Sequence, residues 1–170
     1  MVKGHQMSRA ELRQAVLERL PKGGTGMEVG VWEGGFSEDI LKIVQPRILH
    51  LVDPWAYQPE FDNTAFGKSR NETSMEDKYR SVTEKFKNDD RVVIHRAMSH
   101  EVLETFDDAA LDWIYLDGNH NYEVVKGDLA LARAKVRPGG VISGDDFLWQ
   151  VEAGAPVRTA VREFRRDLGE

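Results

Sequence analysis

Short apolar runs alternate with amphipathic stretches along the whole chain. Runs rich in β-branched and aromatic residues lie at 27–32, 48–52, 91–95, 113–116 and 141–143, and each has the length of a buried strand. Between these runs, apolar residues recur at spacings of three and four, as on one face of a helix. Strands that alternate with helices in this way predict an α/β fold, with a parallel sheet, helices on both of its faces and right-handed crossovers.

The predicted helices have recognisable ends. Ser8 and Glu11 match a capping box at the start of the first helix, which ends at Pro21 and the glycines after it. Further helices are predicted over 36–44, 75–87, 101–106, 122–136 and 156–168. Residues 56–74 are polar without a clear period, which is typical of a lid or a substrate loop. The Arg-Pro-Gly-Gly sequence at 137–140 predicts a turn.

Composition narrows the classes of protein that fit. The 170 residues are 41% hydrophobic and 31% charged, as in one globular domain over 1–170, with residues 1–6 as a tag or disordered end. The net charge of −6 argues against nucleic acid as the main partner. The lack of cysteine excludes disulfides, thiolate metal sites and a cysteine nucleophile. Because no apolar run approaches the roughly 18 residues of a membrane helix, and no signal-peptide core is present, we expect a cytoplasmic protein without a membrane partner.

Acidic side chains follow two of the predicted strands. Asp117 comes directly after the run at 113–116, and Asp145 and Asp146 follow the run at 141–143. The carboxyl ends of parallel strands share one rim of the sheet, where α/β proteins bind ligands. Three carboxylates at neighbouring strand ends repel one another unless a cation lies between them, and oxygen ligands favour Mg²⁺. The alternative interpretation is a set of helix-capping aspartates.

A histidine lies on the same turn as the first of these acids. His120 is three residues beyond Asp117, which is a suitable place for a general base near a metal-bound hydroxyl. A lone histidine is more often a surface or structural residue. We interpret His50 and His95 as structural residues, because each lies within a strand pattern.

A glycine-rich turn follows the first strand. Gly30, Gly34 and Gly35 would let the backbone pass close to a ligand, but Trp32 stands where the NAD fingerprint has its middle glycine. Asp53 ends the next strand, where an acid can accept hydrogen bonds from ribose hydroxyls. These features fit an adenosyl ligand without a pyrophosphate better than NAD. The alternatives are a plain strand-to-helix connection and an Asp-Pro turn.

Four motifs together resemble the small class I S-adenosylmethionine-dependent methyltransferases. They are EVGVWEGGFS at 28–37, LVDPW at 51–55, YLDGNHNY at 115–122 and RPGGVISGDD at 137–146. Within that class the likeness is greatest to the metal-dependent O-methyltransferases that act on sugar hydroxyls of macrolides, and catechol-type enzymes are more distant. The resemblance implies a Rossmann-like sheet in the order 3-2-1-4-5.

The resemblance also implies roles for individual residues. It places the cofactor among residues of the predicted rim, namely Glu28, Gly30, Glu33, Gly34, Ser37, Asp53, Met98, Ser99 and Asp117. In this set Asp53 holds the ribose, and Met98 and Ser99 flank the adenine. It assigns the metal to three acids, which are Asp117, Asp145 and Asp146. His120 matches the general base, which is a lysine in catechol-type relatives.

The predicted function is methyl transfer from S-adenosylmethionine to a hydroxyl of a small glycoside or polyol, with Mg²⁺ as the metal. A non-catalytic S-adenosylmethionine-binding module is one alternative, and a nicotinamide-dependent oxidoreductase is another. Members of the family usually continue into two more strands, which the sequence ending at Glu170 lacks. The strand at 141–143 would then form an exposed edge, so we also expect a homodimer.

Overall fold

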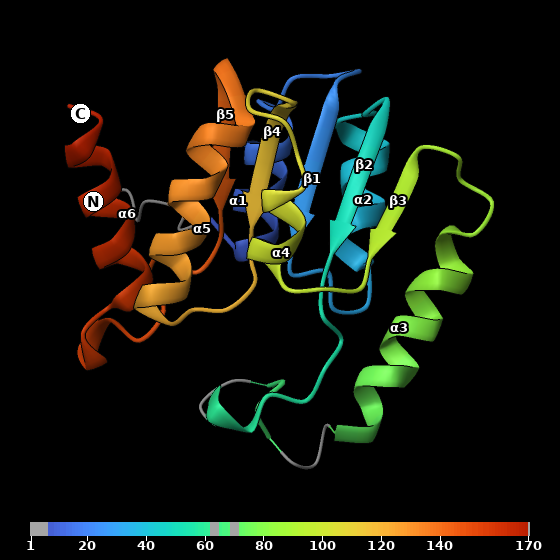
Figure 1. Ribbon diagram of the computed structural model, residues 1–170. Helices are drawn as coiled ribbons and strands as arrows, with labels where there is room; N and C mark the ends of the chain where they lie inside the picture. Colours follow the sequence, from blue (N-terminus) through green and yellow to red (C-terminus); the bar gives the residue numbers. More distant parts are fainter. Residues whose placement is uncertain (1–6, 62–64, 69–71, 170) are drawn as a thin grey trace, which may run out of the picture.

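Five parallel strands form one sheet in the order β3-β2-β1-β4-β5 in the computed structural model, which describes residues 7–61, 65–68 and 72–169 (Figure 1). The strands are β1 (Thr25–Val29), β2 (Ile48–Val52), β3 (Val92–His95), β4 (Leu111–Leu116) and β5 (Val136–Gly144). All four neighbouring pairs are parallel. The predicted fold class and strand order are therefore confirmed. The expectation for residues 1–6 lies outside the described residues.

In the part of the chain that the structure describes, six α-helices surround the sheet. They are α1 (Arg9–Leu17), α2 (Gly35–Ile43), α3 (Glu72–Phe86), α4 (Ser99–Glu104), α5 (Tyr122–Lys135) and α6 (Pro156–Asp167). Figure 1 shows α4 and α5 in front of the sheet and α1 with α2 behind it. The capping box predicted for the first helix is present, with the backbone N–H of Glu11 donating to Ser8 Oγ. Among the described residues, no helix has the length and apolar character that a membrane span requires.

The strand side chains alternate between two apolar cores, as the pleat requires. On one face, Trp113 and Tyr115 pack with Leu17 of α1 and Ile40 of α2. On the other face, Ile114 packs with side chains of α4 and α5. Both faces of the central strands are thus buried, which explains why the strands appear in the sequence as continuous apolar runs.

The register of the sheet brings the strand ends to one level. Val29 pairs with Val52 and with Leu116, and Leu116 pairs with Gly144. The residues that follow these positions in the chain are Gly30, Asp53, Asp117 and Asp145. They consequently form a row along the carboxyl rim of β2, β1, β4 and β5, in the place that the sequence predicted for ligand-binding groups.

One local prediction was wrong. The Arg-Pro-Gly-Gly segment at 137–140 belongs to β5, which begins at Val136 instead of after a turn. The pairing is irregular here, because Val136 lies opposite Leu111 and the next pair joins Val141 to Trp113. The extra residues form a bulge, in which the Arg137 guanidinium donates to Asp112 at 2.7 Å. The turn residues therefore bend the strand without ending it.

Gly26 in β1 lies directly against a buried indole. A Cβ at this position would come within 2.0 Å of ring carbons of Trp113, whose side chain is fully buried. We expect Gly26→Ala to destabilise the fold by about 1–3 kcal/mol through overpacking, measured by urea unfolding. Gly127→Ala in α5 is the matched control, because a Cβ there meets open space and alanine favours a helix. Equal stability of the Gly26 variant and the wild type would contradict this packing.

One edge strand of the described sheet is β5, and within the described residues no strand pairs with its outer side. Pro138 blunts the first half of that edge, so residues 141–144 offer the exposed backbone groups. Self-association through this edge stays a prediction, and light scattering should show a dimer. A monomer at high micromolar concentration, with rapid amide exchange at 141–143, would contradict it.

Candidate functional site

A cavity of about 580 Å³ opens at the carboxyl rim of the sheet. It is lined by seven of the nine predicted cofactor residues, namely Glu28, Gly30, Glu33, Asp53, Met98, Ser99 and Asp117. Ala56, Gln58, Ala65 and Phe66 also line it, so the described part of the predicted substrate loop borders this space. The structure thus brings residues from five separate segments of the chain to one site.

The glycine turn after β1 has the shape that the sequence predicted. Gly30 has φ 89°, and a Cβ there would lie 2.1 Å from the backbone oxygen of Asp117, so only glycine fits. Trp32, at the position of the NAD fingerprint's middle glycine, also has a left-handed backbone, with φ 57°. Gly34 does not line the cavity, because it caps α2 and its α-carbon faces Phe86.

Asp53 holds this turn in place. Its Oδ2 accepts hydrogen bonds from the backbone N–H groups of Val31 and Trp32, both at 3.0 Å, and its Oδ1 accepts one from Trp55 at 2.7 Å. Burial raises the pKa of Asp53, and the three N–H donors partly oppose that rise. Oδ2 already accepts two bonds, whereas Oδ1 accepts one and keeps a second lone pair, so Asp53 can hold the turn and still accept a ribose hydroxyl at Oδ1.

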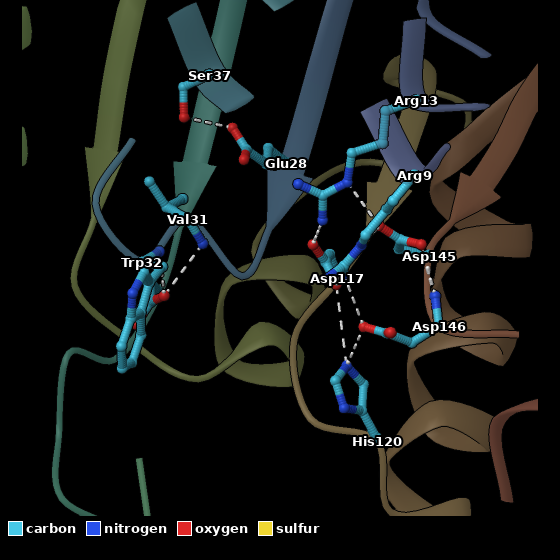
Figure 2. Close-up of polar contacts among 11 residues, drawn as sticks. Arg9, Arg13, Glu28, Val31, Trp32, Ser37, Asp117, His120, Asp145 and Asp146 are labelled. Carbon is cyan, nitrogen blue, oxygen red and sulfur yellow. Dashed lines mark hydrogen bonds and ion pairs between the residues drawn. The ribbon is translucent and has the colours of Figure 1, made fainter. Parts of the chain in front are cut away.

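Glu28 is a buried carboxyl group at the floor of the cavity. It is 1% exposed and accepts a hydrogen bond of 2.5 Å from Ser37 Oγ (Figure 2). Ser37 does not line the cavity, so it acts on the site through Glu28. Burial raises the pKa of Glu28 to about 8, and the nearby Asp117 adds to the rise. An arriving cationic group, such as the ammonium of an amino acid, would favour its ionised form.

The raised pKa of Glu28 has a consequence for stability. Its ordinary pKa of 4.5 rises to about 8 on folding, so the protonated form stabilises the fold below pH 4.5, and this contribution is lost as the pH rises through 8. Between pH 4.5 and 8, the unfolding free energy of the wild type should fall by at most about 1.4 kcal/mol per pH unit. We expect Glu28→Gln to remove this decrease. Urea unfolding at several pH values measures it, with the exposed Glu104→Gln as control. An unchanged pH dependence in Glu28→Gln would contradict the shift.

The acid cluster, which we define as Asp117, Asp145 and Asp146, lies at the same rim, and Asp117 and Asp146 line the cavity. His120 lies beside it, with Nε2 at 3.1 Å from Asp146 Oδ2 and 3.9 Å from Asp117 Oδ1. Burial alone would lower the pKa of His120, but the nearby carboxylates of Asp117 and Asp146 outweigh this effect and raise the pKa to about 9. His120 therefore carries a positive charge in this arrangement.

Three side chains at this rim could share a metal ion. One potential ligand atom from each of Asp117, His120 and Asp146 lies within 4.8 Å of the other two. Asp145, the remaining predicted ligand, instead faces helix α1 and lines a second cavity of about 460 Å³ between α5, α6 and β5. The donor set fits a divalent ion, and the exact ligands stay a prediction.

Two arginines that the sequence reasoning missed reach into the acid cluster. Arg9 Nε donates to Asp145 Oδ2 at 2.9 Å, and Arg13 Nε donates to the same oxygen at 2.6 Å (Figure 2). Arg13 Nη2 also contacts Asp117 Oδ2. Burial would raise the pKa of Asp145, but the backbone N–H of Asp146 and the two arginines hold it below its usual range. The spacing of four residues puts both arginines on one helix face, but it does not identify their partners.

The adenine end of the predicted site has a buried support. Ser99 Oγ donates to Asp128 Oδ1 of α5 at 2.6 Å, and Asp128 is 6% exposed. Asp128 was not a predicted site residue, because its place in α5 follows the pattern of an ordinary helix. His50 and His95 contact each other through ring nitrogens 2.9 Å apart and do not line the cavity, in keeping with a structural role.

A family model described as a methyltransferase domain matches residues 27–147, which is more than half of the chain. That range begins in β1 and ends just after the acid cluster. It therefore includes the glycine turn, Asp53 and His120. Among curated proteins, no sequence matches the chain.

Several solved structures share the fold. Precorrin 8W decarboxylase from Methanobacterium thermoautotrophicum is 20% identical, with 97% of this chain and 74% of that chain covered and a TM-score of 0.60. The N-methyltransferase NodS from Bradyrhizobium japonicum is 14% identical, with 92% and 81% covered and a TM-score of 0.61. A chain described as an rRNA-methylase from Clostridium thermocellum is 15% identical, with 95% and 83% covered and a TM-score of 0.63.

These three likenesses show the fold alone, because the identities are low and the named reactions differ. In four other matched structures, the chain spans between 41% and 47% of the solved chain. The family is shown by the domain model, whose match includes the rim of β1, β2 and β4. The chain thus belongs to the methyltransferase domain family and is a class I S-adenosylmethionine-dependent methyltransferase with a Rossmann-like sheet.

Proposed function

We propose that this methyltransferase transfers the methyl group of S-adenosylmethionine to a hydroxyl of a small glycoside or polyol, with Mg²⁺ at the acid cluster. The observation that carries the proposal is the position of His120. It lines the same cavity as the glycine turn, with Asp117 and Asp146 beside it. A group that can accept a proton and two carboxylates that can bind a metal thus border the space where the methyl donor and the hydroxyl would meet.

The cofactor residues can orient the methyl donor. Gly30 lets the backbone approach the ligand, and Asp53 Oδ1 offers its second lone pair to a ribose hydroxyl. Glu28 can pair with the ammonium of the methionine part. Met98 and Ser99 also line the cavity, and the adenine would lie against them. Correct orientation of the two reactants supplies a large part of the rate in such transfers.

The acid cluster and His120 can prepare the acceptor. Asp117 and Asp146 would hold the divalent ion, which when bound supplies a positive charge that lowers the pKa of an acceptor hydroxyl. His120 Nε2 would take the proton of that hydroxyl. His120 can do this only when it is neutral. Binding of another cation to Asp117 and Asp146 would weaken the contacts that keep His120 protonated.

The acceptor side of the cavity is partly aromatic. The rings of His120 and Trp149 are 5.0 Å apart, and Phe36 and Phe66 also line the space. Flat apolar faces near a polar group suit the ring of a small glycoside better than a charged polymer. The net charge of −6 also disfavours nucleic acid as the acceptor.

Methyl transfer to a panel of sugars, polyols and catechols, with labelled S-adenosylmethionine, tests the proposal. We expect product with a sugar or polyol hydroxyl, and loss of product when a chelator removes Mg²⁺. Full activity in excess chelator would contradict the role of the metal. Methylation of amines or of RNA alone would contradict the proposed acceptor class.

A further inference from the structure

We infer that Arg9 and Arg13 of helix α1 are an internal counter-cation for the acid cluster, and that a divalent ion enters only when the amino-terminal half of α1 leaves the rim. This inference rests on the proposed function, because it concerns access to the same metal site. It adds a conformational control on that site. The two arginines and the carboxylates they contact carry the inference.

Both guanidinium groups point between the carboxylates, and each acid of the cluster has an arginine partner (Figure 2). Arg9 Nη2 donates to Asp146 Oδ2 at 3.1 Å and lies 3.7 Å from Asp117 Oδ1. Arg13 bridges Asp145 and Asp117. The arginines therefore use the oxygens that a metal ion would need.

The arginines and the ion cannot share these oxygens. Asp146 Oδ2 already accepts from Arg9 and lies 3.1 Å from His120 Nε2, so an ion at this oxygen would meet both groups. Mg²⁺ binds oxygen at about 2.0–2.1 Å, which would place it against the guanidinium groups. Two like charges at that separation, in a partly buried site, repel strongly. Binding of the ion and docking of the arginines are consequently alternatives.

The two halves of helix α1 differ in how firmly they pack against the rest of the protein. Its carboxyl-terminal half is anchored, because Leu17 is 1% exposed in the core and Leu20, just beyond the helix, is 3% exposed. By contrast, residues 8–12 are all exposed, and Leu12 is 52% exposed. Arg13 lies 4.8 Å from the centroid of the partly buried Phe36 ring, so release of this half would uncover that ring but no fully buried side chain of α1. It would also open the cavity, which Arg9 and Arg13 line.

Calorimetric titration with Mg²⁺ alone tests the competition. We expect the double variant Arg9→Gln, Arg13→Gln to bind Mg²⁺ about tenfold or more tightly than the wild type, since charge-assisted bonds no longer compete. The control variant Arg19→Gln, Arg133→Gln removes the same charge from exposed positions outside the site. It should bind Mg²⁺ as the wild type does. Binding of S-adenosylhomocysteine shows that each variant is folded.

Amide hydrogen exchange gives a second readout. Adding Mg²⁺ to the wild type should speed exchange at residues 8–13 and leave residues 15–17 protected. Equal Mg²⁺ affinity of the double variant and the wild type, including no binding by either, would overturn the inference. Mg²⁺ binding without faster exchange at 8–13 would overturn it too. Failure of the proposed function would appear separately, as no methyl transfer to any hydroxyl by a protein that binds Mg²⁺ and the cofactor.

Discussion

Replacement of His120 by alanine is expected to lower turnover by about 10²–10⁴-fold, the range for removal of a general base. The physical reason is the position of Nε2 on the cavity wall, beside Asp117 and Asp146. Without the imidazole, the proton of the acceptor hydroxyl must go to water. The affinity for the cofactor should change little, because the glycine turn and Asp53 do not contact His120.

Steady-state kinetics with the acceptor identified in the panel measures this effect, and calorimetry with S-adenosylhomocysteine monitors the cofactor site. His100→Ala is the matched control, because His100 is exposed and lies outside the cavity. If His120→Ala lowers turnover by less than about tenfold while the cofactor affinity is intact, His120 is not the general base and has a structural role beside Asp117 and Asp146.

The second large effect is expected at Asp53. Asp53→Ala would remove the proposed charge-assisted hydrogen bond to the ribose, which is worth about 1.5–3 kcal/mol. It also frees the backbone N–H groups of Val31 and Trp32, so the turn that receives the cofactor loses its support. Affinity for S-adenosylhomocysteine should therefore fall by more than about tenfold, as measured by calorimetry.

Asp53→Asn separates the two roles of this side chain, because it keeps one oxygen acceptor and removes the charge. We expect its affinity to lie between those of the wild type and Asp53→Ala. The exposed Asp107→Ala is the control for a change in net charge. If Asp53→Ala binds S-adenosylhomocysteine as tightly as the wild type, the ribose assignment fails.

Much of the fold and of the rim could be predicted, because they follow from patterns in neighbouring residues of the sequence. Apolar runs predicted the five strands of the described sheet. Asp117, Asp145 and Asp146 were recognised because they directly follow two of these runs. Once the strands are parallel and in register, the residues after them must share one rim. Gly30 was also recognisable, since a close approach of two backbones leaves room only for glycine.

The rest depends on contacts between distant segments. Arg9 and Arg13 meet their acids across more than 100 residues of chain, and no local pattern indicates where α1 docks. The orientation of Asp145 toward α1 follows from that docking. Asp128 supports Ser99 from a helix whose sequence has only the ordinary amphipathic pattern. The bulge at 137–140 looked like a turn, because both contain proline and glycine.

The crystal structure of the protein with bound S-adenosylhomocysteine is the most direct single measurement. We expect the ligand along the glycine turn, with the ribose hydroxyls within hydrogen-bond distance of Asp53. Its sulfur should face the part of the cavity where His120 and Asp117 lie. A ligand in the second cavity between α5, α6 and β5, or a sulfur directed away from His120, would contradict the proposed site.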